Sequence, residues 1–102
     1  MTTIVIGTTP TIRFKFKVIS ISDIVQAKLT IERNNTIVLM KTLADATIGE
    51  GTIEWKLSQS ETLSIGTGHR DIMLNWVIAD GTRGVSPETK VNFISNHIKE
   101  VI

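Results

Sequence analysis

Apolar and polar residues alternate strictly along two stretches of the chain, residues 11–18 (TIRFKFKV) and 25–32 (VQAKLTIE). Successive side chains of a β-strand point to opposite faces, so a period of two is typical of strands that bury one face. We therefore predict two strands with the following inward residues: Ile12, Phe14, Phe16, Val18, Val25, Ala27, Leu29 and Ile31.

Three later stretches, residues 52–57, 70–78 and 89–94, show the same period, and residues 3–6 and 36–41 are shorter stretches that we also interpret as strands. The inward residues predicted for the three later strands are Ile53, Trp55, Leu57, Ile72, Leu74, Trp76, Ile78, Thr89, Val91 and Phe93. Ten inward residues of the chain are expected to be largely buried: Ile12, Phe14, Phe16, Leu29, Ile31, Trp55, Leu74, Trp76, Val91 and Phe93.

Turn-forming residues separate these strands. Residues 34–35 (Asn-Asn) tolerate the positive φ angles of a tight hairpin, and residues 80–81 (Asp-Gly) are the strongest hairpin dipeptide in the chain. Gly84 and Pro87 are expected to interrupt the strand that returns from the second hairpin, because neither favours a continuous ladder. Residues 42–51 have no clear period, and we interpret them as a loop.

Residues 57–68 (LSQSETLSIGTG) lie between two predicted strands but do not alternate. Ser58 and Glu61 have the spacing of a capping box, in which the hydroxyl accepts from the N3 backbone N–H and the carboxylate accepts from the N-cap N–H. We predict one short helical turn near residues 58–64, with Gly66 and Gly68 freeing the backbone to enter the next strand. The alternative is a plain polar loop in which the spacing has arisen by chance.

The whole pattern gives about seven short strands with turn signals every ~8–12 residues, which is typical of an all-β sandwich. Ile, Val and Thr are the most prominent residues, and β-branched side chains favour strands. We predict a single Ig-like antiparallel β-sandwich domain that spans residues 1–102. Residues 97–102 (HIKEVI) are expected to form a final short strand or a frayed helix.

Charge and cysteine content exclude several classes of protein. The formal net charge is +1, so no nucleic-acid partner is expected. The absence of cysteine excludes disulfides, thiolate catalysis and zinc–sulfur sites. No signal peptide is recognisable, and the apolar runs are far shorter than the ~20 residues that span a bilayer, so no membrane partner is expected.

Candidate catalytic residues do not form a recognisable constellation. His69 lies beside Asp71, two residues along in a glycine-rich turn, but it has no second ligand at metal-binding spacing, and we interpret it and His97 as solvated. The serines lack a G-x-S-x-G setting, the acidic residues lack the spacing of a calcium loop, and residues 66–68 (Gly-Thr-Gly) lack a P-loop lysine. We therefore expect no enzyme, no catalytic residue, no cofactor and no metal.

Arg13, Lys15 and Lys17 form a basic row on one face of a predicted strand. Such a row could contact phosphates or an acidic partner. Alternatively, it could be a solubilising outer face, or it could discourage pairing between strand edges. Trp55 and Trp76 fall on inward phases, so we expect them to form the bulk of the core rather than a ligand platform.

Four segments together resemble a known family: GTTPTIRFKF, AKLTIERNNTIVLMK, GTIEWKLSQSETLSIGTG and IMLNWVIADGTRGVSP. They are similar to small β-sandwich structural proteins of phages and prophages of Firmicutes, and loosely similar to the N-terminal domain of baseplate upper proteins. In that family a TPTI-x-F strand, an LT/S-x-x-E-T turn and a strand–DG–strand hairpin recur. This chain departs from the pattern in having Ser58 where threonine is usual, and in its basic row.

The resemblance implies a non-enzymatic tail or baseplate structural protein that acts through protein–protein assembly, located in the virion, or in the host cytoplasm during assembly. Its partners would be other virion proteins or further copies of itself in a homo-oligomer. The alternative is a carbohydrate- or surface-binding module, which an exposed aromatic cluster would favour. Residues 2–6 place apolar side chains on both faces of a terminal strand, so the termini and the basic row are the candidate interface: Ile4, Val5, Arg13, Lys15, Lys17, Val101 and Ile102.

Overall fold

The computed structural model describes residues 2–17 and 19–102, so Val18, which we predicted to face the core, lies outside the described residues. One sheet has the strand order β1-β9-β7-β3-β4, with β8 also paired to β7, and the other has the order β2-β6-β5. The strands of the first sheet are β1 (Thr2–Val5), β3 (Ile24–Arg33), β4 (Thr36–Thr42), β7 (Gly68–Ile78), β8 (Arg83–Val85) and β9 (Thr89–Ile94). The second sheet contains β2 (Thr11–Lys15), β5 (Thr47–Gly49) and β6 (Thr52–Lys56).

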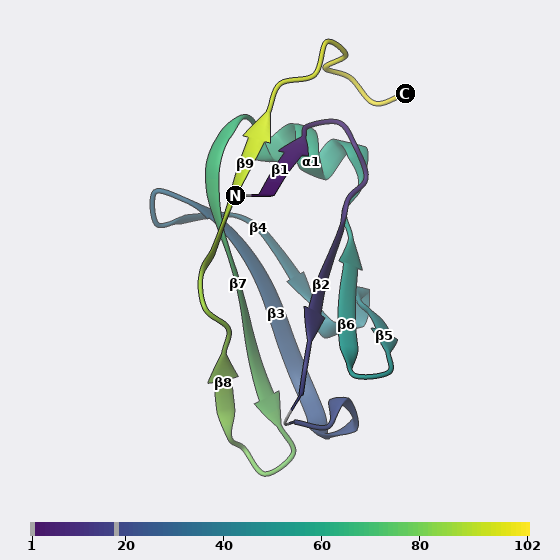
Figure 1. The fold of residues 1–102 in the computed structure, drawn as a ribbon, viewed down its shortest axis with the longest axis vertical. Helices are drawn as coiled ribbons and strands as arrows, with labels where there is room; N and C mark the ends of the chain where they lie inside the picture. Colours follow the sequence, from purple (N-terminus) through teal and green to yellow (C-terminus); the bar gives the residue numbers. More distant parts are fainter. Residues whose placement is uncertain (1, 18) are drawn as a thin grey trace.

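The two sheets face each other and enclose one core, as Figure 1 shows. The larger sheet follows the order of the G, F, C and C′ strands of an Ig variable-type domain, and the smaller follows B, E and D. The protein is therefore an Ig-like β-sandwich, as predicted. Its pairs are antiparallel except that β1 runs parallel to β9, and β8 and β9 are two segments of one interrupted strand beside β7.

The core lies between β3 and β7 of the larger sheet and β6 of the smaller one. Six of the ten residues expected to be largely buried are buried: Leu29, Ile31, Trp55, Leu74, Val91 and Phe93. The other four pack against the core but are only half-buried: Ile12, Phe14, Phe16 and Trp76. Thr89, predicted to face inward, is exposed because it begins β9 at the rim of a surface hollow.

A β-bulge near the start of β3 overturns one predicted inward residue. Ile24 pairs with Ile78 and Gln26 with Val77, so Val25 is an extra residue on β3 with no partner of its own. Val25 is 54% exposed and Ile24 only 7%. The prediction that Val25 faces the core is therefore wrong, while those for Ala27, Leu29 and Ile31 are confirmed.

Both predicted hairpins form. Asn34 and Asn35 have φ angles of 50° and 66°, and Gly81 has a φ of 91° in the four-residue connection between β7 and β8. The returning strand breaks after Val85, where the Ser86 hydroxyl accepts from the backbone N–H of Leu74 at 2.9 Å. The break predicted from Gly84 and Pro87 is thus confirmed.

Two segments differ from their predicted form. Residues 42–51, interpreted as a loop, contain a 3₁₀ turn (Leu43–Asp45) and the short strand β5; another 3₁₀ turn (Ile21–Asp23) precedes β3. The carboxylate of Asp45 accepts from the N–H of Thr42 at 3.4 Å, which fixes the entry to the turn. Residues 97–102 form neither strand nor helix. Within the described part of the chain, no helix has the length and apolarity to cross a membrane.

The predicted helical turn is the helix α1 (Gln59–Ile65), which crosses the end of the sandwich between β6 and β7 (Figure 1). The N–H of Glu61 donates to the Ser58 hydroxyl at 3.2 Å, and the N–H of Ser58 donates to the Glu61 carboxylate at 2.8 Å. Both halves of the capping box are therefore present. After the helix the chain turns at Gly66 and Gly68, which have φ angles of 75° and 116°.

Candidate functional site

The residues considered for catalysis do not come together. His69 on β7 and His97 beyond β9 are both exposed. In the part of the chain that the structure describes, no group of three or more His, Cys, Asp or Glu side chains could hold a metal ion.

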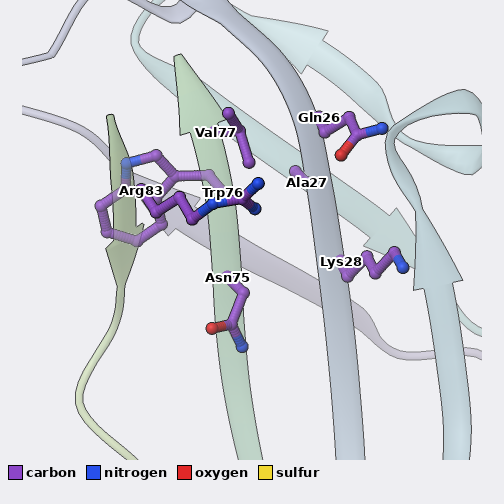
Figure 2. A pocket seen from close by; sticks show the side chains of 7 residues that line it. All are labelled: Gln26, Ala27, Lys28, Asn75, Trp76, Val77 and Arg83. Atoms are coloured by element: carbon purple, nitrogen blue, oxygen red, sulfur yellow. The ribbon is translucent and has the colours of Figure 1, made fainter. Parts of the chain in front are cut away.

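A small hollow of about 120 Å³ lies over β3 and β7, and Figure 2 shows the side chains that line it. Arg83 extends from β8 toward Trp76 and Val77, while Gln26 and Lys28 lie along β3 (Figure 2). Its polar side chains are exposed, and among the described residues no buried polar side-chain atom lacks a hydrogen-bond partner. The hollow therefore lacks the buried, directed polar groups of a ligand site.

The unpaired edge of β2 is a stronger candidate. β2 ends the smaller sheet, with β6 on one side and no strand on the other. The N–H of Phe16 donates to the Gly51 carbonyl, and the N–H of Leu57 donates to the Pro10 carbonyl, so the even-numbered residues of this strand pair with β6. In an antiparallel ladder the alternate residues then turn their N–H and C=O groups the other way. Thr11, Arg13 and Lys15 consequently present backbone donors and acceptors along the free edge.

Two hollows lie beside this edge, between β2 of the smaller sheet and the part of the larger sheet that contains β1, β8 and β9. The first, of about 200 Å³, is lined by Thr2, Ile4, Thr11, Ile12, Arg13, Phe14, Ile72, Thr89 and Val91. The second, of about 180 Å³, is lined by Phe14, Lys15, Phe16, Leu74, Trp76, Val85, Ser86 and Pro87. Phe14 lines both hollows, so they lie next to each other along β2, and we call the pair the β2 groove.

Aromatic contacts shape the wall of the β2 groove. Phe14 meets Trp55 edge-to-face with ring centroids 6.1 Å apart, and Phe16 meets Trp76 in the same way at 5.2 Å. The indole of Trp76 lies so close to Gly84 that a Cβ there would be 2.4 Å from the ring. Glycine at position 84 therefore allows Trp76 to lie flat under β8.

The outer face of the smaller sheet is positively charged beside the free edge. Arg13, Lys15 and Lys17 are all exposed, which is compatible with a solvated row and with a partner-facing row. Arg13 forms an ion pair with Glu54 of β6 at 2.6 Å, whereas Lys15 lies opposite Thr52, and the partner of Thr11 is Lys56. Within β2 and β6, the single carboxylate of Glu54 therefore shares the outer face with three cations, Arg13, Lys15 and Lys56.

The structure brings together some of the predicted interface residues and separates others. Ile4 and Arg13 line the same hollow. Ile4 and Val5 are half-buried in β1, which pairs with β9 inside the domain rather than extending from it. Val101 and Ile102 are exposed and lie near α1, where the N–H of Ile102 donates to the Gln59 side chain at 3.2 Å.

The wall residues on the larger sheet, above all Val85 and Pro87, were missed as site residues. The interruption around Pro87 was the available signal, since a break beside an open edge can line a groove.

No family model matches the chain, and no curated protein matches it. Among solved structures, murine CRIg is 9% identical with a TM-score of 0.43, over 92% of this chain and 90% of that one. The V domain of amphioxus IgVJ-C2 is 10% identical with a TM-score of 0.37, over 90% of this chain and 98% of that one.

Proposed function

We propose that the protein is a non-enzymatic structural component of a phage or prophage virion, of tail or baseplate type, that acts through protein–protein assembly. The observation that carries the proposal is the unpaired β2 edge beside an apolar groove. Sheet edges with free N–H and C=O groups are templates for pairing with another chain, and soluble proteins commonly cover or shorten them. Of the other strands at the ends of the sheets, β1 and β5 have only four and three residues. The seven-residue β4 is held to α1 near its end by the Lys41–Glu61 ion pair.

The aromatic residues favour assembly over carbohydrate binding. All five aromatic side chains of the chain lie at described positions, and none is exposed. Their edge-to-face pairs turn the rings into the core, whereas a sugar platform needs an accessible ring face. The resemblance to phage sandwich proteins supports the virion as the setting of this assembly.

The test is whether the chain travels with phage particles. Particles from the phage or induced prophage that encodes it are purified on a density gradient and examined by mass spectrometry. We expect the chain at a fixed ratio to the other tail proteins, and we expect deletion of its coding region to give incomplete particles. Particles that lack the chain and remain complete and infectious after the deletion would overturn the proposal. Saturable binding of the purified chain to a glycan array would support the alternative instead.

A further inference from the structure

We propose that the free edge of β2 accepts an extended segment of a partner protein whose side chains alternate between apolar and acidic. The inference rests on the proposed assembly function and names the chemistry of the partner. Strand addition of this kind draws affinity from main-chain hydrogen bonds and specificity from pockets for alternate side chains. The β2 edge supplies both.

The main-chain part of the site is the row of N–H and C=O groups on Thr11, Arg13 and Lys15. In the described part of the chain, no protein hydrogen bond reaches these groups from the free side. A strand of five residues spans about 17 Å, enough for an incoming segment of similar length.

The β2 groove would receive the inward side chains of that segment. Each hollow exceeds the ~150 Å³ cavity that admits a benzene molecule, so each can hold one branched apolar side chain. The two hollows meet at Phe14, one toward Ile12 and the other toward Phe16. They are therefore spaced for residues i and i+2 of a strand, which point to the same face.

The outward side chains of the incoming segment would lie beside the basic row. Opposite charges on neighbouring strands stabilise pairing, and like charges destabilise it. Within the described residues, the lysines at 15 and 17 take part in no ion pair, while Arg13 has one acidic neighbour, Glu54. Acidic residues at the outward positions would therefore complement this face.

The same charges argue against a second copy of the chain as the occupant. Antiparallel pairing of two β2 edges around Arg13 would place the two Arg13 side chains together, with each Lys15 near a Thr11 of the other copy. The cations of both basic rows would then lie on one surface, and the pairing would bring no carboxylates to it other than the Glu54 of each copy. A partner that is acidic on its outer face avoids this repulsion.

The probe is a synthetic peptide, acetyl-Ser-Val-Glu-Val-Glu-Val-Ser-amide, titrated into the ¹⁵N-labelled full chain. We expect saturable shifts of the amide signals of Thr11, Arg13 and Lys15, with slowed exchange of these amides. A matched peptide with lysine in place of both glutamates should bind at least about fivefold more weakly, because two attractive pairs become repulsive. Raising the salt concentration should reduce the difference in affinity between the two peptides, because salt screens charges on the surface.

Two variants separate the backbone from the charge contribution. Lys15→Pro removes one free-edge N–H together with the lysine charge, and Lys15→Thr removes the charge alone. Both leave the pairing of Phe14 and Phe16 with β6 intact, and the proline variant should bind the acidic peptide much more weakly than the threonine variant without unfolding the chain. The double variant Arg13→Glu and Lys15→Glu should reverse the preference toward the lysine peptide. Lys28→Glu, on the outer face of the other sheet, is the control and should leave both affinities unchanged.

Three results would overturn the inference: no binding at millimolar peptide, equal binding of the two peptides, or shifts confined to β4 or to the outer face of the larger sheet. If the chain is found in particles but these peptides do not bind, the assembly proposal stands and strand addition at β2 is wrong. If the peptides bind but the chain is absent from particles, β2 is a strand acceptor and the virion setting is wrong.

Discussion

Arg70 is a buried cation, 4% exposed, that holds the end of α1 in place. Its guanidinium donates to the Ile65 carbonyl from Nε at 3.2 Å and from Nη2 at 2.9 Å, and further to the carbonyls of Thr67 and His69. Burial, followed by the charge of Arg33, lowers the pKa of Arg70, but a guanidinium stays protonated at neutral pH. Carbonyls at the C-terminal end of a helix have no backbone N–H partner within the helix, and the planar Arg70 guanidinium supplies donors to them instead.

We predict that Arg70→Met lowers the free energy of unfolding by more than about 2 kcal/mol, because each buried carbonyl left unpaired costs about 1–3 kcal/mol. Arg70→Lys should recover only part of the loss, since an ammonium cannot reproduce the fork. Urea denaturation measures the free energy of unfolding of both variants, and Arg83→Met at an exposed site is the control. A loss at position 70 no larger than at position 83 would contradict the role assigned to Arg70.

The capping box makes a second residue-scale prediction. Ser58→Ala should destabilise the chain by about 0.5–2 kcal/mol through loss of the cap. Glu61→Gln should cost less, and the two losses should not add, because the residues belong to one reciprocal motif. A double-mutant cycle in urea tests this, and additive losses would mean that the two bonds act independently.

The Glu61 carboxylate also gives the cap a dependence on pH. Burial raises the pKa of Glu61, but hydrogen bonds from Lys41 and Ser58 and the charge of Lys41 together outweigh burial, so the pKa lies below its ordinary value. Because the folded-state pKa is lowered, the ionised Glu61 carboxylate stabilises the fold above about pH 4.3, the ordinary pKa of a glutamate. This stabilisation is lost as the pH falls through the folded-state pKa. The stability difference between the native chain and Glu61→Gln should therefore shrink below about pH 4.

At the scale of elements, the bulge in β3 reverses the roles of two neighbouring apolar residues. Ile24 packs in the core cluster and Val25 faces solvent. Ile24→Ala should cost about 2–5 kcal/mol, as for other buried large-to-small changes, whereas Val25→Ala should stay within about 0.5 kcal/mol. Thermal unfolding of the two variants checks the register, and similar losses at both positions would mean that β3 runs without the bulge.

Alternation predicted the strands well wherever a strand buries one continuous face. The predicted strand over residues 52–57 is an example, since Ile53, Trp55 and Leu57 are all buried as expected. Alternation gave the wrong face for Val25, because a β-bulge inserts one extra residue and leaves no signal in the local pattern of apolar and polar residues. It also missed β5, whose three residues are all exposed and therefore show no buried phase.

The open side of the sandwich could not be predicted from the sequence. Phe14 and Phe16 have the same phase whether or not another strand covers the edge of β2. Their half-burial depends on strand order, which arises from long-range pairing and leaves no local trace. The basic row was recognisable in the sequence, but its position beside a free edge was not.

At the scale of the whole molecule, the basic row opposes pairing between the open β2 edges of two copies of the chain. Lysines on an edge strand oppose pairing between copies, because the incoming strand brings its own cations. We predict that the triple variant Arg13→Thr, Lys15→Thr and Lys17→Thr self-associates at tens of micromolar, whereas the native chain self-associates much less. Because salt screens the repulsion between the basic rows, the native chain should self-associate less at low salt than at high salt. Light scattering measures the mass of each. The control replaces three other exposed cations, Lys28, Arg83 and Lys99, with threonine, so the net charge changes equally away from β2. If the two triple variants have the same mass, the position of the basic row is irrelevant to dispersal, and any assembly of the native chain would have to use another surface, such as that of Val101 and Ile102.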